Sequence, residues 1–293
     1  MKPNKDPRNQ VMIKSFVVNA GLIILKALGG IFFASTALIA DAIHSLSDFL
    51  SDTLVLIGLK HSNKPPDEEH PFGHGKIEYV LSLLLGVGIL FIAYQLITHV
   101  IGTLRETPTA PSLHAVYVAI GVIVIKVLLA RYILVKAKRL DSQVLKASAS
   151  ESYSDALGSA VVVLGIGLGV LGAAFNIPAL LYGDALAALV IVIFIVRIAF
   201  MIIADAIRSI LGKSASKPIL DETRAVCESV GGVRQVDKLR MIVYGHYYQV
   251  MVDIRVDGNI TVKEGHDIAS AVKKKLKKSK KIGHVIVHVN PEV

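Results

Sequence analysis

The chain has 293 residues, of which 53% are hydrophobic and only 19% are charged, and its mean hydropathy is +0.58. This composition argues against a soluble globular protein, because a soluble domain of this length carries more charged surface. The net charge of +9 does not by itself indicate nucleic-acid binding, since basic loops on one side of a membrane give the same total. The single cysteine, Cys227, excludes a disulfide framework and a cysteine-rich zinc site.

Long apolar runs predict six membrane-spanning helices, since about 20 residues with a rise of about 1.5 Å each cross the hydrocarbon core. The predicted spans cover residues 11–33, 34–59, 77–101, 113–135, 144–175 and 177–211. The polar N-terminal segment leads into the first span without a small-residue cleavage site, so we expect no signal peptide. We assign residues 1–212 to the membrane domain.

The lysines and arginines of the short loops predict the orientation of these spans. They concentrate in the N-terminal arm, after the second span and after the fourth span, at Lys2, Lys5, Arg8, Lys60, Lys64, Lys76, Lys136, Lys138, Arg139 and Lys146. The opposite side offers only Arg105. We therefore expect a multi-pass protein of the cell membrane with both termini in the cytoplasm.

Ionisable side chains line one face of the second predicted span and one face of the fifth. Residues three or four apart share a helix face, and this spacing holds for Asp41, His44, Asp48 and Asp52, and for Ser148, Glu151, Ser152, Asp155 and Ser159. An Asp at mid-bilayer depth costs roughly 2.5–3.5 kcal/mol on insertion scales, which favours a functional role over simple helix adhesion. Because neither stripe carries a Lys or Arg, the carboxylates need a cation. Two ligands from each helix would give the four that a tetrahedral divalent site uses.

The glycine-rich run in the fifth span, residues 165–172, is not a phosphate-binding loop, because it lies inside an apolar span with no strand before it. Glycines four residues apart, Gly165 and Gly169, are typical of membrane helices that approach a neighbour closely. We expect a packing role for them.

Residues 213–293 are more polar and predict a separate domain with the order helix, strand, strand, helix, strand. The two central strands form a hairpin around Gly245. Two helices on one face of a three-stranded sheet make a small α+β domain of the ferredoxin-like, αββαβ kind. Its lysine run, residues 273–281, is typical of a solvated helix face, and attraction to anionic lipid headgroups is the alternative.

The segments "HSLSD", "HPFGHGKIE", "ESYSDALGS" and "GDALAALV" together resemble the cation diffusion facilitators, exporters of zinc and related divalent metals. The resemblance covers essentially the whole chain. It implies that His44, Asp48, Glu151 and Asp155 form the transport site. Many zinc members have His where this chain has Glu151, and one nitrogen with three carboxylates is a harder ligand set that makes Mn²⁺ or Fe²⁺ more plausible.

Two further groups of residues are metal candidates. In the loop after the second span, Asp67, His70 and His74 match a position where the family can hold a second metal, and a solvated loop with unrelated histidines is the alternative. In the C-terminal domain, the resemblance implies a metal site at a dimer interface formed by Asp253, His266 and His288, with Asp237 as a weaker candidate. Isolated surface histidines are the competing interpretation there.

The resemblance implies a homodimeric efflux transporter, not an enzyme, that exchanges a divalent cation for protons by alternating access in a lipid bilayer. Zn²⁺ is the expected cargo, Mn²⁺ or Fe²⁺ the alternative, and Co²⁺ and Cd²⁺ also suit the ligand set. A membrane metalloenzyme is the second alternative, but four ligands would leave no open coordination position for a substrate. Nucleic-acid binding is not expected.

Overall fold

The computed structural model describes residues 7–62, 64–105, 109–279 and 281–292, and for residues 55–61 the backbone alone. The chain folds as two compact units, Met1–Asp52 with Leu85–Met201, and Thr53–Leu84 with Ile202–Val293. The lysines expected to orient the N-terminal arm, Lys2 and Lys5, lie outside the described residues.

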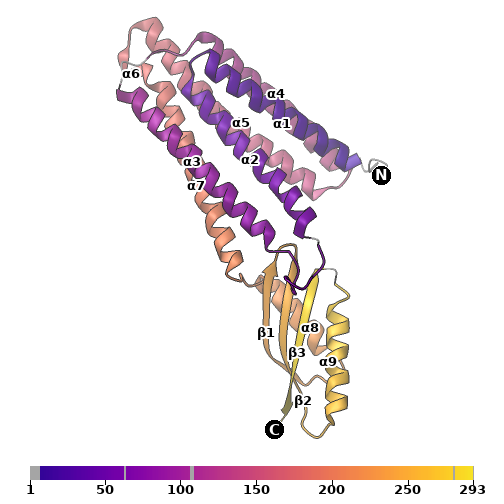
Figure 1. Cartoon of the computed structure of the whole chain (residues 1–293). Coiled ribbons are helices and arrows are strands. Elements are labelled where there is room, and N and C mark those ends of the chain that lie inside the picture. The colour runs from indigo at the N-terminus through magenta and orange to yellow at the C-terminus, as the bar shows by residue number, and fades with distance from the viewer. Residues whose placement is uncertain (1–6, 63, 106–108, 280, 293) are drawn as a thin grey trace. The chain divides into compact units, whose positions relative to one another are not determined.

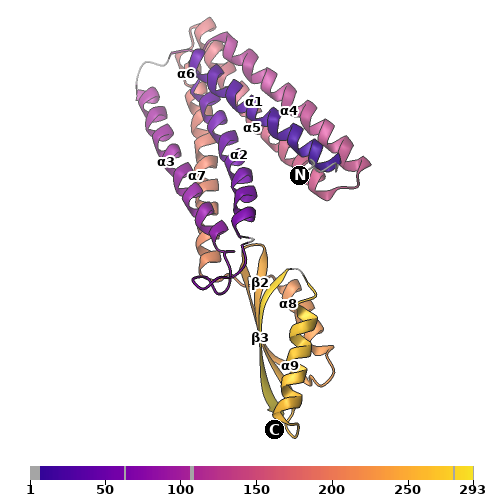
Figure 2. The same ribbon diagram turned by 45° about the vertical axis from the view of Figure 1, so that its right-hand side comes forward.

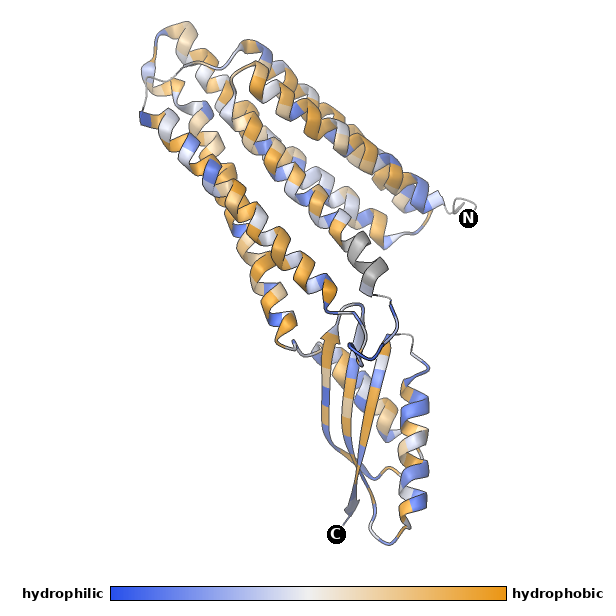
Figure 3. Cartoon of the chain, in the orientation of Figure 1, coloured by the Kyte–Doolittle hydropathy of each residue, from blue (hydrophilic) through white to orange (hydrophobic). Residues whose placement is uncertain are grey.

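Long helices form wherever the sequence is continuously apolar, as the hydropathy colouring in Figure 3 shows. Figures 1 and 2 label α1 (Pro7–Phe32), α2 (Thr36–Ser62), α3 (Ile77–Arg105), α4 (Leu113–Arg139), α5 (Gln143–Phe175), the one-turn α6 (Pro178–Leu181) and α7 (Gly183–Ile210). Five described helical segments are long and apolar enough to cross a membrane. They are α1, α3, α4, α5, and the segment in which α6 continues into α7. Helix α2 has 27 residues, also sufficient length for a span, and it carries the stripe of Asp and His residues that lowers its hydropathy.

Within the first unit, α4 packs against α5 and α1 packs against α4. Helix α5 begins after Ser142, whose side chain accepts a hydrogen bond from the backbone N–H of Leu145, and ends at Asn176 in the left-handed conformation. Gly165 of α5 faces α7 so closely that a Cβ atom there would lie 2.3 Å from Cβ of Ala187. The packing role predicted for Gly165 is therefore confirmed.

The C-terminal part of the second unit has the predicted order of elements. It comprises α8 (Lys217–Glu228), β1 (Gln235–Tyr244), β2 (Tyr247–Asp257), α9 (Val262–Leu276) and β3 (Ile282–Glu292). The sheet order is β1-β2-β3; β1 and β2 are antiparallel, whereas β2 and β3 are parallel. Tyr244 pairs with Tyr247 across a two-residue turn in which Gly245 has a φ of +66°, so the predicted hairpin is confirmed.

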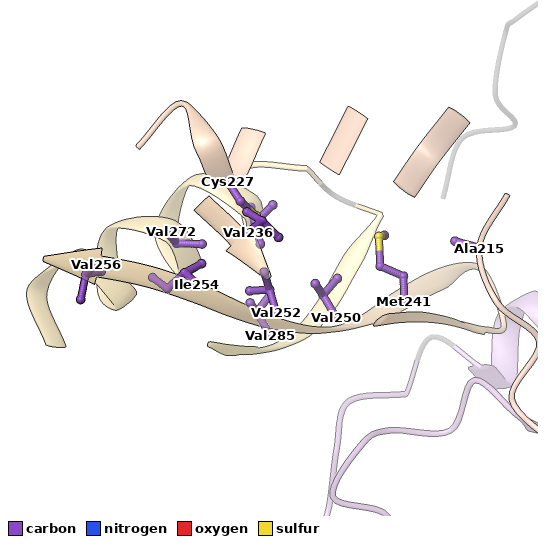
Figure 4. Packing of buried hydrophobic residues seen from close by; sticks show 11 residues of the cluster. Ala215, Cys227, Val236, Met241, Val250, Val252, Ile254, Val256, Val272 and Val285 are labelled. Atoms are coloured by element: carbon purple, nitrogen blue, oxygen red, sulfur yellow. The ribbon is translucent and has the colours of Figure 1, made fainter. Parts of the chain in front are cut away.

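The core of this domain lies between one face of the sheet and the two helices (Figure 4). Alternate residues of β2 face the helices, and Val250, Val252, Ile254 and Val256 are all buried. They pack with Cys227 of α8 and with Val272 and Leu276 of α9. Consequently the intervening residues of β2, including Asp253, lie on the sheet face away from the helices.

Candidate metal centre

Helix α2 presents His44 and Asp48 on one face, one turn apart. Nε2 of His44 lies 3.8 Å from Oδ2 of Asp48, and both side chains are partly buried. The other ring nitrogen of His44, Nδ1, is buried and has no hydrogen-bond partner among the described atoms. The imidazole therefore has coordinating capacity that its protein neighbours do not use.

The start of α2 is fixed by a carboxylate from α7. Asp184 accepts hydrogen bonds from the Ser35 hydroxyl and from the backbone N–H of Thr36, each at 2.6 Å. Ser35 Oγ in turn accepts from the backbone N–H of Leu38 at 3.1 Å. A negative charge at a helix N-terminus is favourable, so Asp184 caps α2 and fixes the position of the helix that carries His44 and Asp48.

Asp155 of α5 completes a group of three with the α2 pair. One ligand atom from each of His44, Asp48 and Asp155 lies within 4.8 Å of the others. The two stripes read from the sequence therefore do meet. One imidazole nitrogen and two carboxylate oxygens form a ligand set suited to a divalent transition metal.

Glu151, the fourth predicted ligand, is not a member of this group. It lies one turn before Asp155 on α5, its side chain is exposed, and its charge interacts with those of Asp52, Asp155 and Asp48. The arrangement described is thus a group of three potential ligands with a further carboxylate nearby, rather than a closed set of four.

A buried lysine of α4 contacts the group, which sequence reasoning did not anticipate. Lys126 is 3% exposed, and its ammonium forms an ion pair with Oδ2 of Asp155. Neither stripe carries a Lys or Arg, but the inference that the carboxylates need a cation overlooked this one, which belongs to the protein. That inference considered only the two helices that carry the carboxylates, whereas the cation comes from a third helix. The available signal was a lone lysine inside the apolar run "VIVIKVLLA".

A second buried ion pair involves Asp41, which was predicted only as part of the polar stripe. Lys26 of α1 lies 2.8 Å from Oδ2 of Asp41 and donates to the hydroxyl oxygens of Ser45 and Ser159 at 2.9 and 3.3 Å. Ser159 also donates to Oδ2 of Asp41 at 2.8 Å. This network neutralises the Asp41 carboxylate and connects α1, α2 and α5. Asp52, the other supporting residue of the stripe, is exposed.

The loop between α2 and α3 brings its three candidate ligands together. Asp67 Oδ1 lies 3.2 Å from Nδ1 of His70, and Asp67 Oδ2 lies 3.3 Å from Nε2 of His74. The backbone N–H of His70 donates to the Asp67 carboxylate at 2.7 Å, and this hydrogen bond lowers the pKa of Asp67 below its usual value. The aspartate is therefore held in its ionised, metal-binding form, and Nδ1 of His74 is buried without a partner among the described atoms.

This loop is attached to the β1–β2 hairpin within the second unit. The backbone carbonyl of Phe72 accepts hydrogen bonds from the Tyr247 hydroxyl at 2.9 Å and from Nε2 of Gln249 at 3.2 Å. The Tyr244 hydroxyl donates to the carbonyl of Gly73 at 3.2 Å. These contacts fix the backbone between His70 and His74.

The candidates of the C-terminal domain do not form one cluster in a single chain. Asp253 and His288 are register partners on β2 and β3 and lie on the face of the sheet away from the helices, whereas His266 lies on α9. In the described part of the chain these three residues make no group with metal-ligand spacing. Asp237 is already paired, with Arg255 at 2.8 Å and with the Asn290 amide at 3.2 Å, which leaves it a poor ligand.

Comparison with known proteins gives a consistent result over both parts of the chain. The family model described as the cation efflux transmembrane domain matches residues 12–211, and the cation efflux protein cytoplasmic domain matches residues 215–292. The manganese efflux system protein MneP of Bacillus subtilis (strain 168) is 30% identical over 96% of this chain and 95% of MneP. The magnetosome protein MamM of Paramagnetospirillum magneticum is 33% identical over 87% of this chain and 79% of MamM. A solved cadmium form of the MamM CTD is 27% identical, covers 26% of this chain and 98% of its own, and has a TM-score of 0.26.

Proposed function

Since the chain belongs to the cation diffusion facilitators, a family of divalent-metal efflux transporters, we propose that it exports Mn²⁺ through a site formed by His44, Asp48 and Asp155. The observation that carries this proposal is the convergence of these three side chains from two apolar helices, with ligand atoms within 4.8 Å of one another. Ionisable groups at membrane depth are retained where they serve a substrate or ion pathway. We propose Glu151, one turn before Asp155 on α5, as the fourth ligand.

The ligand chemistry supports Mn²⁺ over the Zn²⁺ expected from the family resemblance. Oxygen ligands suit harder cations such as Mn²⁺, and Glu151 adds a third carboxylate to a single imidazole. The relative MneP carries the name of a manganese efflux protein. Zn²⁺ is the second candidate, because His44 offers a nitrogen ligand that Zn²⁺ favours.

We propose that protons replace the metal when it leaves. Carboxylates that lie together in a low-dielectric environment cannot all remain charged without a cation, so loss of the metal favours proton binding. One site then carries either a divalent cation or protons, which is the requirement for an antiporter. Alternate opening to the two sides would proceed by movement of helices around the site.

We further propose that both termini lie in the cytoplasm of a cell membrane and that two chains form a homodimer. The orientation follows from the lysines and arginines of the short loops, and the dimer from the matching cytoplasmic-domain model. On the exposed sheet face, Asp253 and His288 lie side by side, where a partner domain could complete a metal site. The loop cluster of Asp67, His70 and His74 is proposed as a second metal site.

Reconstitution into liposomes tests the transport proposal directly. A pH step across the liposome membrane should drive Mn²⁺ uptake by the wild-type protein, and Zn²⁺ added in competition should inhibit it only at higher concentration. Asp155→Asn should abolish uptake. The matched control is Asp141→Asn, since the Asp141 side chain is 93% exposed before α5. Uptake by Asp155→Asn at the wild-type rate would remove the site from the pathway, and stronger inhibition by Zn²⁺ would reverse the assignment of cargo.

A further inference from the structure

Lys126 lies at the junction of α4 with the proposed metal site. It is almost completely buried, at 3% exposed, in the middle of an apolar helix, and burying an ammonium is costly unless it is paired. Its partner is Oδ2 of Asp155, a residue whose ligand atom is part of the group with His44 and Asp48. The protein therefore keeps a positive charge in contact with a carboxylate of the proposed metal site.

The second buried lysine shows what a purely structural pair looks like in this molecule. Lys26 has three polar partners, and Asp41 also accepts from Ser159, so both charges are enclosed at 0% and 4% side-chain exposure. Within the described residues, Lys126 has a single polar partner. That partner is 22% exposed. The Lys126 ammonium can thus leave Asp155 without breaking a wider network.

The charges near the proposed metal site indicate what the weaker attachment of Lys126 means for metal binding. The proposed ligands Asp48, Glu151 and Asp155 carry three negative charges when ionised, and Lys126 carries one positive charge. Asp52, which interacts with Glu151, is exposed and is not a proposed ligand. The proposed ligand set with its lysine therefore has a net charge of minus two, which one divalent cation neutralises. Without the lysine, a bound divalent cation would leave one negative charge uncompensated in the membrane interior.

We propose that Lys126 is a tethered counter-cation of the transport site. Its ammonium neutralises Asp155 while the metal is absent, withdraws from that carboxylate when a divalent cation binds, and competes with the cation for it. This competition weakens metal binding and so favours release of the metal. The inference rests on the proposed function, because it takes Asp155 as a ligand of the cargo.

Metal affinity of the purified full-length protein in detergent tests this role without requiring transport. Calorimetric titration with MnCl₂ gives the dissociation constant, and the binding component that disappears in Asp155→Asn defines the transport site. Lys126→Met, which keeps most of the length of the side chain and removes its charge, should bind Mn²⁺ at that site at least tenfold more tightly than wild type. Lys126→Arg, which keeps the charge, should remain within about twofold of wild type, as should the control Lys138→Met on the exposed end of the same helix.

The increase in metal affinity of Lys126→Met should be similar for Mn²⁺ and Zn²⁺, because it arises from the loss of a positive charge rather than from a change of ligand type. Unchanged or weaker binding by Lys126→Met would overturn the proposal, and so would a gain for one metal alone. If Lys126→Met is not monodisperse on size exclusion, Lys126→Gln tests the same loss of charge. A binding isotherm unchanged by Asp155→Asn would instead refute the site assignment itself, so the two failures are distinguishable.

Discussion

The buried pair of Lys26 and Asp41 should hold the helices together without binding the cargo, and a double-mutant cycle can measure this. Both side chains are enclosed, at 0% and 4% exposure, and the two charged atoms lie 2.8 Å apart. Removing one partner leaves the other charge unpaired at membrane depth. Insertion scales place that cost at roughly 2.5–3.5 kcal/mol, close to the value of about 3–5 kcal/mol for breaking a buried ion pair. We therefore expect Lys26→Met and Asp41→Asn each to lower the free energy of unfolding by about 3 kcal/mol.

The double variant should lose much less stability than the sum of the two single variants. With both charges removed nothing is left uncompensated, since the amide that replaces the carboxylate can still pair with the Ser159 hydroxyl, and we expect this variant within ~2 kcal/mol of wild type. Unfolding by SDS titration in mixed micelles, followed by circular dichroism, measures all four proteins. Mn²⁺ affinity of the double variant should match wild type. Additive losses would show that the pair is not coupled, and loss of Mn²⁺ binding in a folded double variant would make Asp41 part of the metal site.

Two further substitutions and one labelling experiment test the packing around the site and the C-terminal domain. Gly165→Leu should reduce thermal stability by an amount equivalent to about 1–3 kcal/mol, because its Cβ would lie 2.3 Å from Cβ of Ala187. The control Gly167→Leu should be tolerated, because a Cβ there would have no atom within 4 Å. Equal melting temperatures for the two variants would contradict the contact between α5 and α7. Asp184→Asn should lower stability by about 1–2 kcal/mol in the same assay, since it removes the charge that caps α2. Burial raises the pKa of Cys227 to about 11, so only about one thousandth of the thiol is ionised at pH 8 and its reaction with a thiol reagent should be slow until the domain unfolds or the pH approaches 11. Fast labelling of the native protein at pH 8 would show that the core around Cys227 opens.

The membrane helices and the order of elements in the C-terminal domain could be predicted from the sequence because both depend on local patterns. A continuous apolar run long enough to span a bilayer has few alternatives to a helix. The convergence of His44 and Asp48 with Asp155 was also predictable, although less directly. Polar faces on two apolar helices are stable only if they are buried against each other or around a polar occupant.

The partners of the carboxylates could not be predicted from the same patterns. Lys26 and Lys126 lie on helices without a polar stripe, and which helices adjoin α2 and α5 is decided by packing rather than by periodicity. Each lysine stands alone in an apolar run, which is itself unfavourable in a membrane. A lone lysine in such a run implies a buried carboxylate partner, and the two stripes supply carboxylates inside apolar helices.

The C-terminal candidates, predicted to meet at a dimer interface, lie on different layers of the domain within one chain. Side chains alternate along a strand, and the predicted core residues of β2 already place Asp253 on the face away from the helices. His266 lies on one of those helices. Strand alternation therefore predicts from the sequence that His266 does not share a face with Asp253 and His288 in one chain. A site that contains all three residues would need a partner chain.

The distribution of charge in the first unit indicates where an ion can enter. At Asp41 both the ammonium of Lys26 and the Ser159 hydroxyl contact Oδ2, and the same ammonium also contacts two serine hydroxyls, so a divalent cation would have to displace several interactions at once. At Asp155 a single ammonium must withdraw, and two further ligands are already within 4.8 Å. The molecule thus neutralises Asp41 and Asp155 in two different ways, with a network of partners beside Lys26 and with one ion pair beside Lys126. At Asp155 a divalent cation displaces one ammonium, whereas at Asp41 it would have to displace several interactions. We therefore expect the cargo to bind at Asp155 and not at Asp41.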